Sequence, residues 1–203
     1  MSKLFTKRTF IVVSPTARTS PDFPLKGIAG STGRLDVIAR SILTILQLDE
    51  NIRKSIVFKA LLMGPPNPPI VLEVYGSLVR GIYENEIKVI EAIRKVLAGE
   101  HVEGFSIEKV SLKKLLENLL NTHERVYYLH ENGEEILRSI KPAKTIAFIL
   151  GSHVDIPTEY EVIIDKMDIP RVSLGSISYL TSQCIIIVNW LLDNYGKHLW
   201  RLP

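Results

Sequence analysis

The sequence predicts one α/β domain, residues 1–203, in which a mainly parallel β-sheet is flanked by helices. Two observations support this fold class. Short apolar runs rich in β-branched residues alternate with longer segments of helical periodicity, a pattern typical of strands joined by crossover helices. The chain has 203 residues, 46% of them hydrophobic, which suits one core better than two.

The first elements lie in the N-terminal quarter. Residues 9–14 (TFIVVS) are predicted to form a buried strand. Residues 15–33 follow as a polar loop, and loops of this length inside compact domains are often functional. Residues 35–46 carry apolar side chains at helical spacing, so we expect an amphipathic helix there.

Two further strands, over residues 55–63 and 70–75, are separated by a proline-rich connection at 64–69 (GPPNPP). Proline has no backbone N–H, so this connection is not expected to continue either strand ladder. Residues 84–97 and 112–120 are predicted helices, and the segment between them is predicted to be irregular.

The C-terminal half shows the strand–loop–helix order most regularly. Strands are predicted over residues 126–129, 145–150 and 171–174. A turn is expected at 130–133, directly after the first of these strands. The helices that follow the three strands are expected to run to about residue 140, over about 158–167 and over about 180–194.

The loop that follows each of these three strands carries a glycine, namely Gly133, Gly151 and Gly175. The carboxyl ends of parallel strands share one sheet edge, so we expect the three loops to form one pocket. Glycine lets backbone approach a ligand closely, although each glycine alone is also compatible with an ordinary turn. No G-x-G-x-x-G or G-x-x-x-x-G-K-[ST] motif is present, so neither usual nucleotide site is indicated.

Composition narrows the class of protein. A net charge of +3 permits an anionic partner without demonstrating one. The single cysteine, Cys184, excludes an internal disulfide framework and favours a cytoplasmic location. No apolar run approaches the roughly 20 residues of a membrane-spanning helix, so no membrane association is expected. His130 and His153 lie in two of the pocket loops without further ligands at suitable spacing, so no metal site is predicted.

Several segments resemble known methyltransferases. FILGSHVDIPTE (148–159) and RVSLGSISYLTSQCIIIVNWLLD (171–193) resemble the cofactor-binding end of SPOUT methyltransferases. LKGIAGSTGRLDVIARSI (25–42) and MGPPNPPIVLEVYG (63–76) resemble, more narrowly, the archaeal tRNA (pseudouridine(54)-N1)-methyltransferase family. The resemblance runs in order over nearly the whole chain, with no matching motif in residues 82–121.

The resemblance implies S-adenosylmethionine as cofactor, tRNA as partner and methylation of N1 of pseudouridine 54 in the T-loop. It also implies a homodimer and a C-terminal trefoil knot, an exception to ordinary chain topology, within a cofactor-binding part at about residues 125–203. Carried onto this chain, the cofactor contacts fall mostly on backbone groups and apolar walls. These residues are Leu129, Gly151, Leu174, Gly175, Ile177, Leu180 and Cys184.

Methyl transfer to N1 needs alignment of that nitrogen and management of one proton. Asp36 opens a helix, whose dipole keeps a carboxylate ionised, and is our candidate to accept or orient the proton. Arg34 is the candidate to hold a base carbonyl or a phosphate with its planar fork. The alternative is that both are ordinary surface residues at a helix start.

Cys184 has two interpretations. A cysteine beginning a helix can act as a nucleophile. Methylation of pseudouridine at N1 does not require addition to the ring, and an apolar run follows this cysteine, so we favour a pocket wall.

The RNA backbone is expected to contact the 15–33 loop and the basic residues Arg18, Lys26 and Arg53. Two other functions remain open. One is a related SPOUT enzyme that methylates pseudouridine in ribosomal RNA. The other is a binding module that holds RNA or a nucleotide without catalysis.

Overall fold

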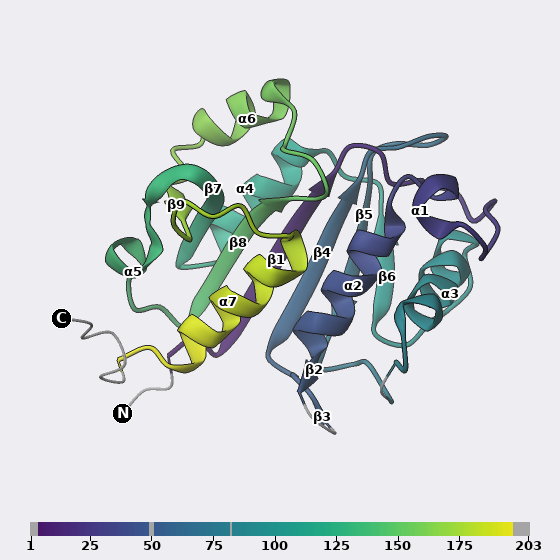
Figure 1. Ribbon diagram of the computed structural model, residues 1–203, viewed down its shortest axis with the longest axis horizontal. Helices are drawn as coiled ribbons and strands as arrows, with labels where there is room; N and C mark the ends of the chain where they lie inside the picture. The colour runs from purple at the N-terminus through teal and green to yellow at the C-terminus, as the bar shows by residue number, and fades with distance from the viewer. Residues whose placement is uncertain (1–3, 49–50, 82, 197–203) are drawn as a thin grey trace.

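The computed structural model describes residues 4–48, 51–81 and 83–196. Most strands join one seven-stranded sheet. They are β1 (Lys7–Ser14), β4 (Ile56–Leu62), β5 (Ile70–Tyr75), β6 (Phe105–Glu108), β7 (Arg125–Glu135), β8 (Thr145–Gly151) and β9 (Arg171–Ser173). Their order across the sheet is β6-β5-β4-β1-β8-β7-β9, so the N-terminal strand lies in the middle (Figure 1). Two short strands, β2 (Gln47–Leu48) and β3 (Asn51–Ile52), pair separately.

The sheet is mainly parallel, which confirms the predicted fold class. β1 pairs in parallel with β4 and β8, and β7 pairs in parallel with β8 and β9. β5 and β6 add an antiparallel edge beside β4. The sequence did not predict β6, because its four residues are too few to show a clear alternation and only Phe105 is buried.

Helices cover both faces of the sheet. The long helices α2 (Leu35–Leu46) and α7 (Thr181–Asp193) lie side by side on one face, with α3 (Glu86–Leu97) beyond α2 (Figure 1). α4 (Leu112–Thr122) and α6 (Thr158–Asp165) cover the other face. Two short helices, α1 (Ile28–Ser31) and α5 (Ile136–Ser139), lie in connections.

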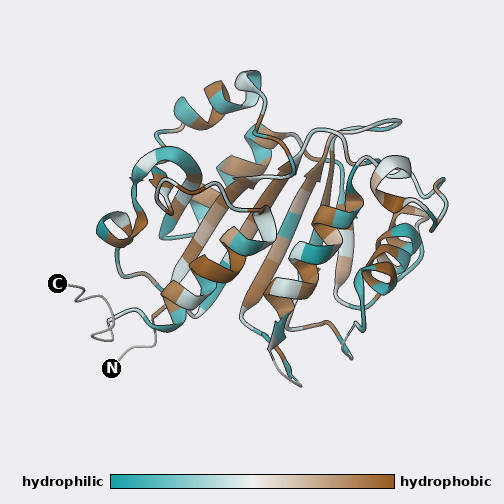
Figure 2. Cartoon of the chain, viewed as in Figure 1, coloured by the Kyte–Doolittle hydropathy of each residue, from teal (hydrophilic) through white to brown (hydrophobic). Residues whose placement is uncertain are grey.

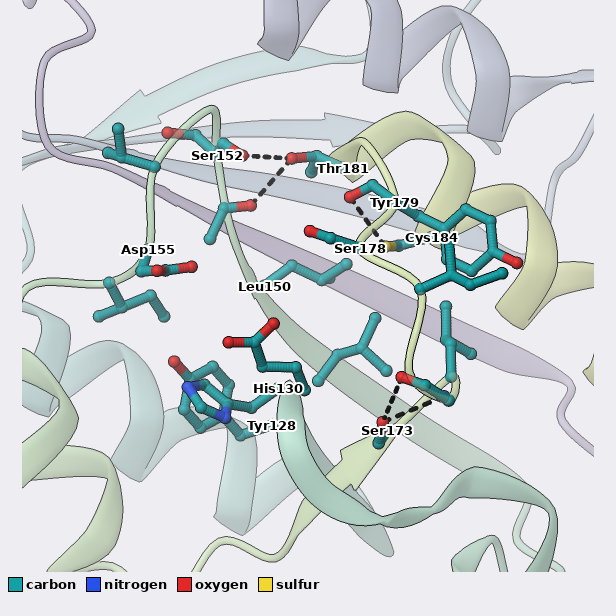
Figure 3. Close-up of a pocket in the computed structure, with 18 residues that line it drawn as sticks. Tyr128, His130, Leu150, Ser152, Asp155, Ser173, Ser178, Tyr179, Thr181 and Cys184 are labelled. Atoms are coloured by element: carbon teal, nitrogen blue, oxygen red, sulfur yellow. Dashed lines mark hydrogen bonds between the residues drawn. The ribbon is translucent and has the colours of Figure 1, made fainter.

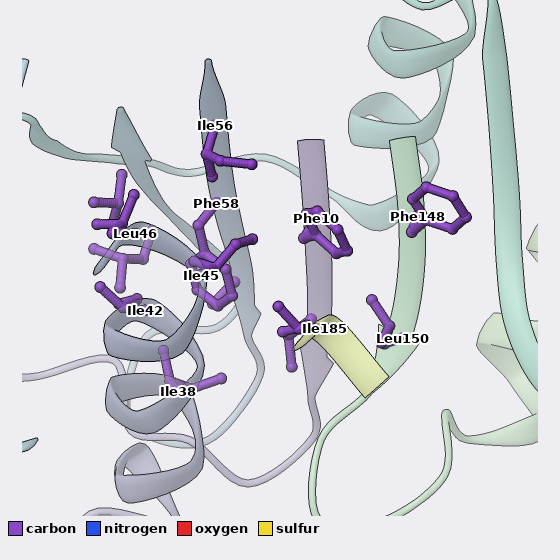
Figure 4. Close-up of a cluster of buried hydrophobic side chains, with 14 of the residues drawn as sticks. Phe10, Ile38, Ile42, Ile45, Leu46, Ile56, Phe58, Phe148, Leu150 and Ile185 are labelled. Carbon is purple, nitrogen blue, oxygen red and sulfur yellow. The ribbon is translucent and has the colours of Figure 1, made fainter. Parts of the chain in front are cut away.

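Alternation along the strands divides the core into two layers. Phe10 and Phe58 point toward α2 and α7, where Ile38 and Ile185 pack against them (Figure 4). Ile11 and the other strand side chains on the opposite face of the sheet point toward α4 and α6. The central strands are therefore apolar on both faces, as Figure 2 shows, which is the pattern expected of a covered parallel sheet.

The predicted helix over residues 35–46 is confirmed with the same bounds. The helices predicted at 84–97 and 112–120 are α3 and α4, which begin at side-chain caps. The Asn85 carboxamide accepts the N–H of Lys88 at 3.1 Å, and the Ser111 hydroxyl accepts that of Lys114 at 3.3 Å.

The turn predicted at residues 130–133 is wrong, because β7 continues to Glu135. Val172 of β9 pairs first with Leu129 and then with Glu134, so the intervening residues form a bulge. Gly133 is required there, since a Cβ on it would lie 2.5 Å from the backbone of Val172. Pairing with β9 thus overrides the local turn signal.

An ionic cluster joins the start of β1 to the end of α7. The buried Arg8 donates from Nη1 to Asn189 Oδ1 at 3.0 Å and to Asp193 Oδ1 at 2.7 Å. Arg53 reaches the other carboxylate oxygen of Asp193 at 2.8 Å. This cluster lies at the amino end of β1, opposite the predicted pocket. No helix within the described ranges is long and apolar enough to cross a membrane.

Candidate active site

A pocket lies at the carboxyl edge of the sheet, between residues 128–131 of β7, at the start of its bulge, and the segments that follow β8 and β9 (Figure 3). It contains about 700 Å³ of empty space, part of which is open to solvent. Six of the seven predicted cofactor residues line it. They are Leu129, Gly151, Leu174, Gly175, Ile177 and Cys184.

The seventh, Leu180, is not among the lining residues that the structure describes. It precedes α7 and its side chain is 62% exposed. The backbone N–H of Leu180 donates to Gln183 Oε1 at 2.9 Å, so this donor is used at the start of α7 and does not face the pocket.

Hydroxyl groups hold the pocket loops in place. The Thr181 hydroxyl lies 2.5 Å from the carbonyl oxygen of Ser152 and 3.1 Å from that of Gly151, which ties the loop after β8 to the start of α7 (Figure 3). The Ser173 hydroxyl accepts the N–H of Gly175 at 3.1 Å. Thr181 and Ser152 were not predicted from the sequence, because their role depends on a contact between two segments about 30 positions apart.

The pocket glycines have individual backbone reasons. A Cβ on Gly151 would lie 2.8 Å from the carbonyl oxygen of Val154. Gly175 has φ of 107°, a conformation that residues with a Cβ rarely adopt. Gly133 is not among the pocket-lining residues that the structure describes, and it is required instead by the close packing of its backbone against β9.

Tyr128, which lines the pocket, belongs to a polar cluster that continues behind it. Its hydroxyl donates to Glu161 Oε1 at 2.7 Å, and the guanidinium of Arg171 lies over its ring at 5.3 Å. Burial, together with the hydrogen bond to Glu161, raises the pKa of Tyr128 far above its usual value. Tyr128 is therefore a neutral structural group at physiological pH.

Cys184 is a thiol in this environment. Its Sγ lies 3.7 Å from the carbonyl oxygen of Tyr179, and burial raises the pKa of Cys184 to about 11. A thiol with this pKa is a poor nucleophile at neutral pH, which favours a place in the pocket wall.

Arg34 and Asp36 lie at the start of α2, after the loop that leaves β1. Arg34 adopts φ of 73°, and its guanidinium donates from Nε to Asp36 Oδ1 and from Nη2 to Oδ2, each at 3.0 Å. Burial opposes ionisation of Asp36, but hydrogen bonds and charge from Arg34, with a contribution from Arg40, lower the pKa of this carboxyl below its usual value. The Asp36 side chain is only 13% exposed.

The register of the sheet brings these residues toward the pocket. Val13 of β1 pairs with Gly151 of β8, so the chains leaving both strands start side by side. The Thr16 hydroxyl donates to the carbonyl of Gly33 at 2.8 Å, which holds the segment before Arg34 against the end of β1. Within the part of the chain that the structure describes, no group of His, Cys, Asp or Glu is arranged to hold a metal ion.

The chain is similar to known proteins over almost its whole length. Residues 7–196 match a family described as "Putative SAM-dependent RNA methyltransferase". The tRNA (pseudouridine(54)-N(1))-methyltransferase of Methanocella arvoryzae is 34% identical over 190 residues, which cover 92% of this chain and 98% of the relative. The enzyme of the same name from Methanocaldococcus jannaschii is 30% identical, with coverages of 92% and 96%.

The fold is also similar to that of Archaeoglobus fulgidus Nep1, crystallised with S-adenosylhomocysteine. The TM-score is 0.65 at 14% identity, over 93% of this chain and 98% of Nep1. The mainly parallel sheet with a pocket at its carboxyl edge is the architecture of an α/β enzyme that binds its ligand in strand-end loops. The chain belongs to the family of S-adenosylmethionine-dependent RNA methyltransferases that includes the tRNA (pseudouridine(54)-N1)-methyltransferases.

Proposed function

We propose that this protein methylates N1 of pseudouridine 54 in the T-loop of tRNA, with S-adenosylmethionine as methyl donor. Relatives that carry this name match the chain over almost its full length. The observation that carries the proposal is the placement of the Arg34–Asp36 pair beside the strand-end pocket. One side of the site then holds the donor, and the other holds the base.

The pocket residues fit the methyl donor. Leu129, Leu174 and Ile177 offer apolar walls for an adenine ring, and the loops around them offer backbone groups for its edge. Asp155 adds an exposed carboxylate to the lining, which suits a ligand that carries positive charge. When bound, the donor supplies a methyl group on a positively charged sulfur that is already activated for transfer.

Asp36 and Arg34 are proposed to hold the base. The low pKa of Asp36 keeps it ionised but makes it a weak base, so it orients N1–H as a hydrogen-bond acceptor. The rigid pairing with Arg34 fixes the direction of both carboxylate oxygens. The Arg34 side chain is 38% exposed, which leaves donors for a base carbonyl or a phosphate.

We further propose a homodimer. Ile186 and Trp190 lie four residues apart on α7, and each is about half exposed. Ile177 and Leu180 add exposed apolar surface just before the same helix. An apolar surface of this kind, next to the pocket, supports a second copy of the chain as its cover.

A SPOUT-type trefoil knot is proposed within residues 125–203, of which 197–203 lie outside the described residues. β9 lies at the edge of the sheet, but the next helix, α7, returns toward the middle of the sheet and packs beside α2. The start of α7 is held by the loop after β8, through the hydrogen bond from Thr181 to Ser152. This return path supports the knot. The lone thiol of Cys184 suits the reducing cytoplasm, where we expect the enzyme to act.

Transfer of labelled methyl groups to RNA tests the function. Purified protein is incubated with methyl-labelled S-adenosylmethionine and T-arm-containing tRNA that carries either pseudouridine or uridine at position 54. We expect N1-methylpseudouridine, identified by nucleoside mass spectrometry, only in the first substrate. Methylation of ribosomal RNA fragments in place of tRNA would favour the rRNA enzyme, and binding without transfer to any RNA would favour a binding module.

A further inference from the structure

His153 lies in the loop after β8, between two residues that line the pocket, Ser152 and Val154. The loop is fixed through the Ser152 carbonyl, which accepts the Thr181 hydroxyl (Figure 3). The His153 ring is exposed, and its Nδ1 lies 3.3 Å from the Ser152 hydroxyl. It therefore stands at the rim of the pocket, on the wall nearest to β1.

The neighbouring wall comes from the chain that leaves β1. Because Val13 pairs with Gly151, residues 15–16 and residues 152–153 leave the sheet at adjacent positions. Gly33 packs on Thr16 so closely that a Cβ on Gly33 would lie 1.8 Å from the Thr16 carbonyl oxygen. The Arg34–Asp36 pair, which follows Gly33, is thereby held on the side of the site where His153 stands.

The electrostatics of His153 agree with this placement. Partial loss of solvent around the ring and the charge of Arg34 lower the pKa of His153 below its usual 6.5, and the charge of Asp36 partly opposes them. Arg34 and Asp36 are the charged groups that act on the ring. His153 is therefore a neutral imidazole at pH 7, with a free lone pair on one ring nitrogen.

We propose that His153 is the general base that takes the N1 proton during methyl transfer, an inference that rests on the proposed function. With Nδ1–H donating to the Ser152 hydroxyl, Nε2 is the acceptor nitrogen. The N1–H group first donates to Asp36, which orients the base. The N1–H bond then breaks and its proton moves to Nε2 of His153. The N1–CH₃ bond forms as the S–CH₃ bond breaks, which releases S-adenosylhomocysteine, and the imidazolium then returns its proton to solvent.

The other groups near the site are less suited to this role. Asp36 has a lowered pKa, so its carboxylate is a weak base. Cys184 is a thiol with a pKa of about 11. His130 is already engaged, since its Nδ1 accepts the N–H of Asn132 at 3.1 Å and its Nε2 lies 3.6 Å from Glu161.

The first test is a pH series of single-turnover methyl transfer to tRNA with pseudouridine 54. The wild-type rate is expected to level off toward neutral pH and to fall in the acidic range, with an apparent pKa below 6.5, as the His153 imidazole becomes protonated. His153→Gln is expected to lose about 100-fold at pH 7, the usual contribution of a general base. Its rate should rise with pH, because hydroxide then replaces the missing base. The exposed His101 provides the matched control, and His101→Gln should follow the wild-type profile.

Two measurements separate this role from a structural one. The affinities of His153→Gln for S-adenosylhomocysteine and for tRNA should equal those of the wild type. Added imidazole should restore transfer in His153→Gly. A His153→Gln variant with the wild-type rate and pH profile overturns the proposal, and so does a loss explained by weaker binding. If the wild type itself fails to methylate pseudouridine 54, the proposed function is wrong before any variant is compared.

Discussion

Arg34 holds both carboxylate oxygens of Asp36 through two hydrogen bonds of 3.0 Å. The two residues are only two positions apart, and the pairing is possible because Arg34 adopts a left-handed backbone conformation just before α2. The pair presents a fixed, ionised acceptor beside the pocket, and this geometry leads to the first prediction.

Asp36→Ala should reduce methyl transfer by about 100-fold, since a poorly positioned reacting group commonly costs that much. Affinity for S-adenosylhomocysteine, measured by calorimetry, should be unchanged because Asp36 does not line the pocket. Glu86 is a matched control, as it also opens a helix and pairs with an arginine, Arg40. Near-wild-type transfer by Asp36→Ala would remove Asp36 from the mechanism.

Cys184→Ser should retain methyl transfer, because the thiol is proposed as a wall residue. With its pKa raised to about 11 from an ordinary 9.0, Cys184 remains protonated at pH 7.5. Alkylation by iodoacetamide should therefore be slow at pH 7.5 and accelerate toward pH 11, in a rate series followed by intact-protein mass spectrometry. Abolished transfer with intact cofactor affinity would instead support a nucleophile.

Asp193→Asn should destabilise the fold at neutral pH by about 2 kcal/mol. This is less than the usual cost of breaking a fully buried pair, because one-third of the Asp193 side chain is exposed. The loss arises because the buried Arg8 would keep its charge without a carboxylate partner. Urea unfolding measures the effect, and Glu103→Gln, which breaks the exposed Arg80 pair, should change stability by less than about 0.5 kcal/mol.

The same aspartate gives a pH dependence. Burial opposes its ionisation, but hydrogen bonds and charge from Arg53 and Arg8 lower the pKa of Asp193 below 3.8. Its stabilisation is therefore present above pH 3.8 and is lost as the pH falls through the lower folded-state pKa. The stability difference between wild type and Asp193→Asn should shrink in that acidic window. A difference that stays constant down to pH 2 would contradict the pairing.

Gly33→Ala should disturb the start of α2. Gly33 has φ of 62°, and an added Cβ would lie 1.8 Å from the Thr16 carbonyl oxygen, so backbone must move. We expect a loss of at least about 1 kcal/mol in unfolding free energy and a clear loss of methyl transfer. Gly30→Ala is the control, since nothing lies within 4 Å of its Cβ position. Equal behaviour of the two variants would refute the contact.

The expected RNA contacts separate into two groups. Lys26 is exposed in the loop after β1, and Arg18 lies in the same loop. Arg53 is instead paired with Asp193 at the opposite end of the sheet. Lys26→Ala and Arg18→Ala should weaken tRNA binding, and each should reduce the slope of log K against log salt concentration by about 1. Arg53→Ala should leave this slope unchanged. Filter binding at several salt concentrations measures all three, and identical slopes would remove the loop from the interface.

The spacing of hydrophobic residues predicted the elements that pack on one another, such as α2 and the central strands, because buried positions follow the period of the helix or strand. It did not predict the continuation of β7 past Leu129, since that segment is ordered by β9 and not by its own residues. α1 was also missed, because none of its four residues is buried.

Much of the candidate pocket could be predicted from the sequence, because the loops after β8 and β9 follow recognisable strands and begin with or contain a glycine. The closeness of His153 to the Arg34–Asp36 pair could not be predicted from the sequence. It depends on β1 inserting between β4 and β8, and strand order is set by the packing of the whole chain. No local pattern around His153 carries that information.

The central position of β1 also constrains how the protein is made. β1 leaves the ribosome early, but its neighbour β8 and its ionic partner Asp193 are synthesised much later. Until then β1 has one free edge and exposes apolar side chains that α6 and α7 will later help to cover. The native sheet closes by joining the two ends of the polypeptide, which favours slow folding. A nascent chain that stops before residue 145 therefore carries an unpaired hydrophobic strand, a ready target for chaperones and proteases.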